Sequence, residues 1–102
     1  MRRNVLITGS NSGIGLAILK RLLEDDYFIF AHYHSSNDNL KSMKSDNIYP
    51  IQGDLCKVKD VKKVFNKCLE VGGGVDILIN NAGAFSISPN IEEIAEDDFD
   101  KI

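Results

Sequence analysis

Three glycines lie close together near the start of the chain, in the segment T-G-S-N-S-G-I-G at residues 8–15. Gly9 permits a sharp turn after a strand, Gly13 permits the backbone to approach a phosphate group, and Gly15 permits a helix to pack closely on a sheet. The first turn of that helix offers unpaired N–H groups and a partial positive charge. We therefore predict that this glycine loop (residues 8–15) binds a pyrophosphate, with further donors from three short polar side chains: Ser10, Asn11 and Ser12.

The spacing of the glycines distinguishes the loop from other phosphate-binding loops. It is G-x-x-x-G-x-G instead of G-x-G-x-x-G. No Gly-Lys pair followed by Ser or Thr is present, which excludes the phosphate loop of nucleoside triphosphatases. The position of the loop, between a predicted strand and a predicted helix, makes it more informative than a glycine triplet alone.

Apolar periodicity predicts strands that alternate with helices along the whole chain. The expected strands cover residues 4–8, 27–33, 47–52 and 75–80, and the expected helices cover 13–23, 38–44 and 60–69, with a last helix starting near 91. Strands separated by helices pair in parallel through right-handed crossovers. Pro50 lacks a backbone N–H, so the third strand is expected at an edge of the sheet. We therefore predict an α/β chain, half of a doubly wound parallel fold with helices on both faces.

Polar side chains follow the third and fourth predicted strands. Asp54 comes after the third strand, and Asn80 and Asn81 follow the fourth. The carboxyl ends of parallel strands meet at one edge of a sheet, where doubly wound folds bind their ligands. Asp54 can accept a hydrogen bond from an adenine amino group there, and a turn or helix-cap role is the alternative. The amides of Asn80 and Asn81 are expected at the same edge.

Together these segments resemble the short-chain dehydrogenases/reductases. The glycine loop is similar to the family's cofactor fingerprint, Gly53-Asp54-Leu55 to the pair that contacts adenine, and the N-N-A-G at 80–83 to the motif that ends the fourth strand. The resemblance covers essentially the whole chain and looks most like the 3-oxoacyl-[acyl-carrier-protein] reductase branch. It implies the N-terminal half of a Rossmann doubly wound parallel sheet, with four strands in the order 3-2-1-4, and a bracing role for Asn80. The residues expected to bind the dinucleotide are Gly9, Ser10, Asn11, Ser12, Gly13, Ile14, Gly15, His34, Ser35, Asp54, Leu55, Asn81, Ala82 and Gly83.

The end of the second strand bears on which nicotinamide cofactor is bound. An acidic residue there would accept from the ribose hydroxyls and repel a 2′-phosphate, but residues 31–36 read A-H-Y-H-S-S, without an acid. Members of the family that use NADP often carry Arg where His34 falls, and His34, Ser35 and Ser36 can donate to a phosphate. We therefore predict NADP, with NAD as the alternative and an exposed loop position as the other interpretation of His34. His32 is expected to be structural, and no third ligand makes His32-x-His34 a metal site.

The catalytic residues of the family are missing from the chain. The resemblance implies a Ser and a Y-x-x-x-K pair, in which Tyr donates a proton and Lys lowers its pKa. The tyrosines are Tyr27, Tyr33 and Tyr49, and none is followed four residues later by Lys. We predict the N-terminal part of an NAD(P)-dependent oxidoreductase, with NADP(H) favoured, that reduces a carbonyl or oxidises an alcohol by hydride transfer, truncated before the catalytic half and inactive alone. The alternatives are a non-catalytic dinucleotide-binding fragment and a split-gene half completed by a second chain.

Composition sets the broad class of the protein. The 102 residues, 43% hydrophobic and 26% charged, fit one globular domain over residues 1–102. A net charge of −3 argues against nucleic-acid binding, and the apolar runs are too short to cross a membrane. Two cysteines and no recognisable leader predict a cytoplasmic protein. An open edge on the fourth strand predicts a marginal, self-associating monomer unless a second chain completes the sheet, and full-length members of the family are expected to be homo-oligomers.

Overall fold

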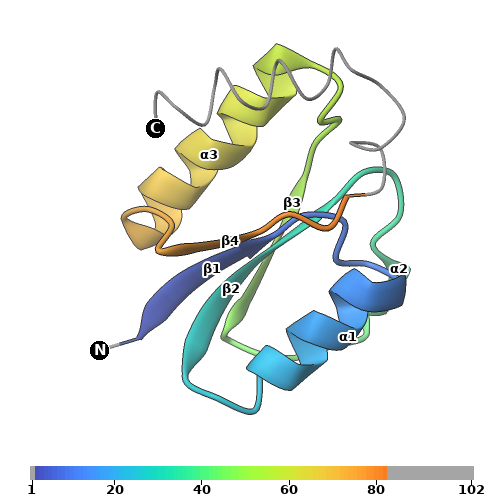
Figure 1. Cartoon of the computed structure of the whole chain (residues 1–102), viewed down its shortest axis with the longest axis vertical. Helices are drawn as coiled ribbons and strands as arrows, with labels where there is room; N and C mark the ends of the chain where they lie inside the picture. Colours follow the sequence, from blue (N-terminus) through green and yellow to red (C-terminus); the bar gives the residue numbers. More distant parts are fainter. Residues whose placement is uncertain (1, 83–102) are drawn as a thin grey trace.

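A parallel sheet of four strands forms the centre of the structure, a computed structural model that describes residues 2–82 (Figure 1). The strands are β1 (Arg3–Ile7), β2 (Tyr27–Tyr33), β3 (Ile48–Gln52) and β4 (Ile77–Ile79). The helices are α1 (Gly13–Leu22), α2 (Asp38–Lys41) and α3 (Val58–Gly72). A helix follows each of β1, β2 and β3, as the apolar periodicity predicts.

The order of the strands is β3-β2-β1-β4, and all neighbours are parallel. This confirms the predicted α/β fold and the order 3-2-1-4. β1 lies inside the sheet, where Val5 is paired with Ile29 of β2 and with Ile77 of β4. β3 is at an edge, and its Pro50 is paired with Ala31, in agreement with the placement that a residue without an N–H requires. The loops that follow the strands therefore gather at one end of the sheet.

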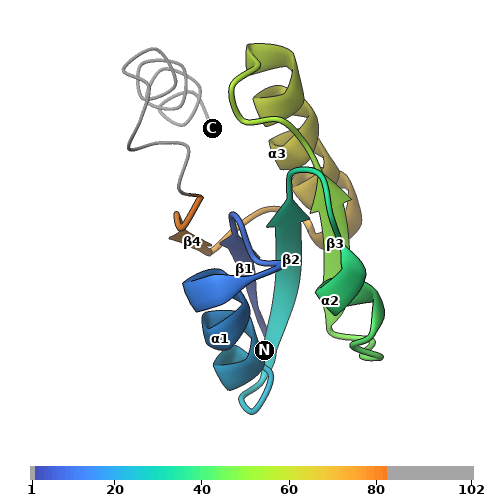
Figure 2. The same cartoon turned by 90° about the vertical axis from the view of Figure 1, so that its right-hand side faces the viewer.

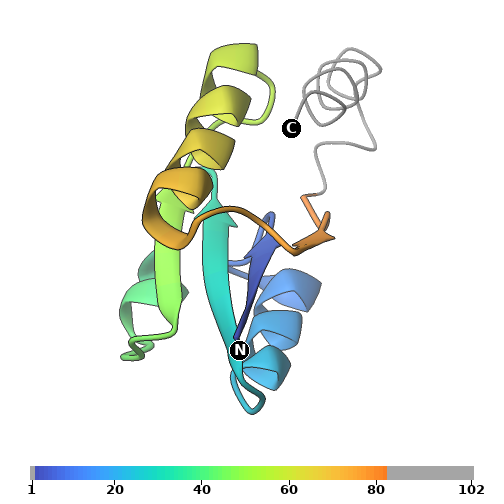
Figure 3. The same ribbon diagram turned by 90° about the vertical axis from the view of Figure 1, so that its left-hand side faces the viewer.

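Side chains that alternate along the strands build one core on each face of the sheet. On the first face Ile7 packs with Leu19 of α1 and Leu40 of α2. On the second face Leu6 packs with Val64 of α3. Helices α1 and α2 thus cover one face and α3 covers the other, as Figure 2 and Figure 3 show from opposite sides.

A glycine and an asparagine fix the end of α3. Gly73 has a φ of 84° and forms the left-handed cap that ends the helix. The Asn4 side chain donates from Nδ2 to the carbonyl oxygens of Gly72 at 2.7 Å and Gly74 at 3.0 Å. The start of β1 is thereby tied to the end of α3.

Several boundaries differ from the prediction: α2 ends at Lys41 instead of residue 44, and bounds of β1, α1 and β3 differ by one residue. α3 starts before residue 60 and continues to its glycine cap. β4 is shorter than residues 75–80 because it pairs only with the last three residues of β1. The helix predicted from residue 91 lies outside the described residues. Within residues 2–82, no helix is long and apolar enough to cross a membrane.

Candidate functional site

The glycine loop lies at the carboxyl end of β1 and turns the chain into α1. Gly9 and Gly13 have φ values of 63° and 59°, which residues with a β-carbon rarely adopt. A β-carbon on Gly13 would meet no atom within 4 Å. A β-carbon on Gly15 would overlap the Gly9 carbonyl oxygen and the Asn81 side-chain nitrogen. The loop therefore leaves room for a ligand beside Gly13, whereas Gly15 allows the close packing that the sequence predicts.

Helix α1 presents its N-terminus to this open side of the loop. The first N–H groups of a helix have no partner within the helix, and the aligned peptide dipoles add a partial positive charge. No acidic residue occupies the first turn of α1, and the N-cap residue Ser12 makes no side-chain capping bond. The unpaired donors and the space beside Gly13 together suit an anion such as a pyrophosphate.

The three polar side chains of the loop have different roles. Ser10 is fully buried, and its hydroxyl donates to the carbonyl oxygen of His32 at 2.8 Å. The Asn11 side chain accepts two backbone N–H groups at the start of α2 at 3.1 and 3.2 Å. Ser12 is exposed. Ser10 and Asn11 thus hold the loop in position, and Ser12 is the residue whose hydroxyl can meet a phosphate.

The Thr8 hydroxyl joins the loop to the segment that follows β4. It donates to Oδ1 of Asn80 at 3.0 Å and accepts the backbone N–H groups of Asn81 at 2.9 Å and Ala82 at 3.1 Å. The Asn81 side chain donates to the Gly9 carbonyl oxygen at 3.1 Å. Asn80 therefore braces the ends of two strands, and the backbone of Asn81 and Ala82 runs beside the glycine loop.

His32 is buried beneath the loop at 2% exposure. The Gly9 N–H donates to Nδ1 of His32 at 3.0 Å, and Nε2 lies 2.8 Å from the carbonyl oxygen of Gly53. Because Nδ1 accepts, the ring hydrogen is on Nε2 and is donated to Gly53. Burial lowers the pKa of His32 below its ordinary value, so the ring is neutral at neutral pH.

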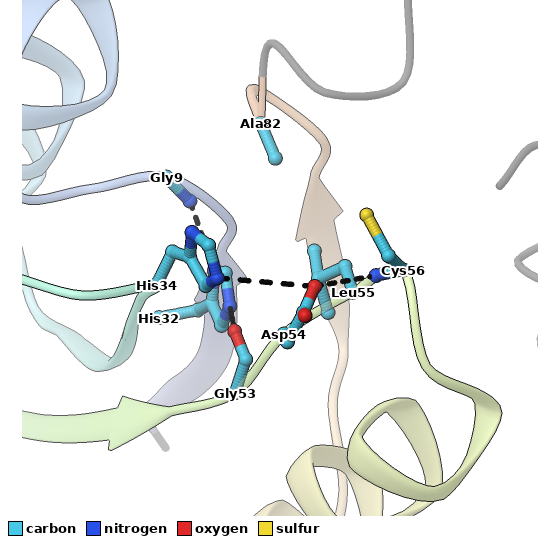
Figure 4. Close-up of a pocket in the computed structure, with 8 residues that line it drawn as sticks. All are labelled: Gly9, His32, His34, Gly53, Asp54, Leu55, Cys56 and Ala82. Atoms are coloured by element: carbon cyan, nitrogen blue, oxygen red, sulfur yellow. Dashed lines mark hydrogen bonds and ion pairs between the residues drawn. The ribbon is translucent and has the colours of Figure 1, made fainter. Parts of the chain in front are cut away.

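A cavity of about 220 Å³ opens at the ends of the strands (Figure 4). Its lining comes from segments that are far apart in the sequence: Gly9, His32 and His34, residues 53–56, and Ala82. Leu55 supplies an apolar side chain, and Asp54 supplies a carboxylate. An apolar wall beside a hydrogen-bond acceptor suits a flat ring with an amino group, such as adenine.

Asp54 has a partner within its own turn and also lines the cavity. Its Oδ1 accepts the backbone N–H of Cys56 at 2.9 Å, and this hydrogen bond lowers the pKa of Asp54. The same oxygen lies 3.9 Å from Nε2 of His34. The carboxylate therefore shapes the turn after β3 while it also lines the cavity.

A second hollow, of about 200 Å³, shares Gly9 and His34 with the first. Its other lining residues are Asn11, Ser12, Tyr33, Ser35 and Ser36. None of these described lining residues carries a carboxylate. Hydroxyl groups and an imidazole thus stand together at the end of β2, beside the glycine loop, in the arrangement that would receive a phosphate.

The structure brings most of the predicted binding residues to one end of the sheet. Ser10 is buried away from both hollows, Ile14 is exposed on α1, and Gly83 lies outside the described residues. Sequence reasoning does not identify Thr8 and His32 as residues that organise the site. The sequence features that could have identified them are the hydroxyl of Thr8 at the end of a buried strand and the imidazole of His32 within an apolar strand. Within residues 2–82, no group of three or more His, Cys, Asp or Glu residues could hold a metal ion.

Comparisons with known proteins agree with this geometry. A family model described as short chain dehydrogenase matches residues 3–102. The 3-oxoacyl-[acyl-carrier-protein] reductase of Staphylococcus epidermidis is 32% identical over 89 residues, which are 81% of this chain and 36% of that protein. The solved structure of ElxO with NADP bound has a TM-score of 0.71 at 32% identity, over 81% of this chain and 36% of the other. Menthone neomenthol reductase from Mentha piperita has a TM-score of 0.72 at 26% identity, over 81% and 32%. The chain thus spans about a third of the length of these proteins.

Proposed function

The chain belongs to the short-chain dehydrogenase family, and on that premise we propose that it is the cofactor-binding part of an oxidoreductase that transfers a hydride between NADP(H) and a carbonyl or alcohol. The observation that carries the proposal is the glycine loop, with its open side at Gly13 and the N-terminus of α1 behind it. The nicotinamide ring would supply or accept the hydride when the cofactor is bound. The residues of this chain bind and orient the dinucleotide.

Each part of the dinucleotide has a matching part of the site. The pyrophosphate is expected at the N-terminus of α1, with Ser12 as an additional donor. The adenine ring is expected in the cavity beside Leu55, with its amino group near the Asp54 carboxylate. Asn81 and Ala82 then lie along the cofactor, since Thr8 holds their backbone against the glycine loop.

The preference for NADP over NAD rests on the second hollow. A 2′-phosphate there would meet His34, Ser35 and Ser36. Residues 31–36 contain no Asp or Glu. No carboxylate from this segment at the end of β2 would therefore repel the 2′-phosphate. The NADP-bound relative gives independent support for this cofactor in a structure of the same fold.

The substrate and the oligomeric state of the whole protein are proposed from its relatives. Reduction of a 3-oxoacyl group is the activity that the printed name of the Staphylococcus epidermidis relative suggests. The alternatives to an oxidoreductase part are a non-catalytic binding fragment and a split-gene half, and no observation favours them. A cytoplasmic location is consistent with two free thiols, Cys56 and Cys68. Oligomers of the full-length protein are expected by analogy with the family.

Titration of the chain with NADPH and NADH, followed by the fluorescence of the reduced nicotinamide, tests the proposal. We expect tighter binding of NADPH than of NADH. In His34→Asp the NADPH affinity should fall by about tenfold or more, because a carboxylate repels the 2′-phosphate, while NADH binding is retained. His34→Gln is the matched neutral control and should lose less. If neither dinucleotide binds, the proposed function is wrong, and if His34→Asp leaves the ratio unchanged, His34 is not at the 2′-phosphate.

A further inference from the structure

Both nitrogens of the buried His32 ring are used, and each is bonded to a different part of the dinucleotide site. Nδ1 accepts the N–H of Gly9, the turning residue of the glycine loop, at 3.0 Å. Nε2 donates to the carbonyl oxygen of Gly53, which precedes Asp54, at 2.8 Å. The side chain of His32 therefore lies between Gly9 and Gly53 (Figure 4), which belong to the proposed phosphate side and adenine side of the site.

The backbone of His32 strengthens the same connection. Its carbonyl oxygen accepts the N–H of Ser10 at 2.9 Å and the Ser10 hydroxyl at 2.8 Å. Gly9 and Ser10 are thus both attached to one residue of β2. Gly53 is attached to β2 a second time, because its N–H donates to the Tyr33 carbonyl oxygen at 3.1 Å.

We propose that His32 is a positioning residue for the dinucleotide, which holds the glycine loop and the Gly53 turn at the spacing that the cofactor needs, and that protonation of Nδ1 releases this hold. The inference rests on the proposed function. A doubly protonated ring has an N–H at both nitrogens. The new N–H at Nδ1 would face the N–H of Gly9, so an attraction becomes a contact between two donors. The hydrogen bond from Nε2 to the Gly53 carbonyl oxygen can persist. Protonation therefore loosens only the attachment of the glycine loop to His32.

The surroundings of His32 favour the neutral ring. Burial is the main cause that lowers its pKa; the hydrogen bond to Gly53 opposes this, and His34, which follows β2, lowers the pKa further. The turn after β3 contributes Asp54 and Cys56 to the same cavity, and α3 contributes Asp60, which accepts the Asp54 N–H. The glycine loop and the end of β4 bring only uncharged groups, among them Asn80 and Asn81.

The direction of the pH effect follows from this lowered pKa. The unfolded chain takes up the proton near the ordinary value of 6.5, whereas the folded chain takes it up at a lower pH. The neutral ring's contribution is therefore fully present above the unfolded value and is lost as the pH falls through the folded value. Dinucleotide affinity and stability should both decline on acidification.

Two substitutions separate the two hydrogen bonds of the ring. In His32→Asn, an amide oxygen lies where Nδ1 was and can accept the Gly9 N–H, but the side chain does not reach Gly53. In His32→Gln, an amide nitrogen lies where Nε2 was and can donate to the Gly53 carbonyl oxygen, but the side chain has no well-placed acceptor for the Gly9 N–H. Neither amide titrates. Both variants are made in a His34→Gln background, so that the second imidazole does not contribute, and NAD⁺ is the ligand because it has no 2′-phosphate to titrate.

Calorimetric titration with NAD⁺ from about pH 8 down to about pH 5 extends below the ordinary histidine pKa. With His32 present, we expect the affinity to fall progressively once the pH drops below the lowered pKa of the folded chain, because a bound dinucleotide requires the unprotonated Nδ1. His32→Asn should bind more tightly than His32→Gln and should show no fall. An equal fall in His32→Asn, or equal binding by the two amide variants, would overturn the proposal.

A measurement on the chain with His32 in place tests the proposal even where the variants fail to fold. Nitrogen-15 NMR of His32 should find Nδ1 unprotonated at about pH 8, and the exchange protection of the Gly9 amide should drop as this nitrogen takes up a proton. Constant Gly9 protection through that step would contradict the release. Absence of NAD⁺ and NADP⁺ binding at the higher pH would instead refute the proposed function, because His32 is neutral there.

Discussion

The backbone N–H of Asn81 donates a hydrogen bond to the Thr8 hydroxyl oxygen at 2.9 Å, across 73 positions of the sequence. The hydroxyl is almost completely buried, so water cannot replace it as a partner. One side chain at the end of β1 therefore fixes the path of the chain after β4. The relative position of the glycine loop and the Asn81 segment depends on this group.

Removal of the Thr8 hydroxyl should be costly, and Thr8→Val removes it with little change of shape. The partly buried backbone N–H groups of Asn81 and Ala82 would lose their acceptor, which costs about 1 kcal/mol. We expect urea unfolding to report that loss, and NADPH titration to report weaker binding. Thr8→Ser, which keeps the hydroxyl, should lose much less. A Thr8→Val chain as stable as Thr8→Ser would mean that these hydrogen bonds contribute nothing measurable.

Two glycines with similar backbone geometry allow a matched test of the phosphate position. Gly13 and Gly73 have φ values of 59° and 84°, and a β-carbon on either meets no atom within 4 Å. Gly13→Ala and Gly73→Ala should therefore each cost about 1–2 kcal/mol of stability through backbone strain. Only Gly13→Ala should also abolish NADPH binding, and Gly13→Val should do so more completely. Normal NADPH binding by the Gly13 variants would remove the pyrophosphate from this loop.

The two cysteines should differ in their reaction with thiol reagents. Burial raises the pKa of the Cys68 thiol to about 12, while Cys56 is exposed at the cavity that Asp54 and Leu55 line. Because the thiolate is the reactive form, one equivalent of a chromogenic disulfide should react with the folded chain and two with the chain in urea. NADPH should slow the first reaction. Cys56→Ser should leave no thiol that reacts in the folded state, and a fast reaction in that variant would mean that Cys68 is accessible.

The edge of β4 should be the source of any self-association. Within the described residues β4 pairs only with β1, and Leu78 on the α3 side is 38% exposed. A lysine on an edge strand discourages pairing with a second chain. We expect Leu78→Lys to shift the chain towards monomer in sedimentation velocity. Leu69→Lys, at a more exposed leucine on α3, is the control and should shift it less. Equal effects would place the contact elsewhere.

Most of the fold follows from the sequence because its signals are local. The apolar run at 27–33 has the bounds of β2, and α1 begins at the predicted glycine. Parallel pairing follows from the alternation of strands and helices, whereas the strand order 3-2-1-4 is implied by the family resemblance. The length of β4 does not follow, because it depends on how many residues of β1 it faces.

The site could be predicted only where backbone freedom is the requirement. The positions of Gly9, Gly13 and Gly15 follow from the turn, the phosphate approach and the helix packing that they permit. The sequence predicts that the side chains of Ser10 and Asn11 supply donors to a phosphate; in the structure they bond to β2 and α2, and Asn11 also lines the second hollow. Their direction depends on residues that lie more than twenty positions away, and no local pattern carries that information.

The register of β4 on β1 also determines the order in which the molecule can be built. Val5 meets Ile77 only after nearly the whole described chain has been synthesised, and closing so long a loop is slow compared with forming helices or neighbouring strand pairs. β1, an inner strand of the described sheet, must therefore be an edge strand during part of folding. Its unpaired N–H and C=O groups can then form hydrogen bonds with another strand. The dinucleotide site, which needs Asn81 beside Gly9, cannot exist before that last strand docks. A nascent chain that binds a dinucleotide at this site has, for this reason, already paired β4 with β1.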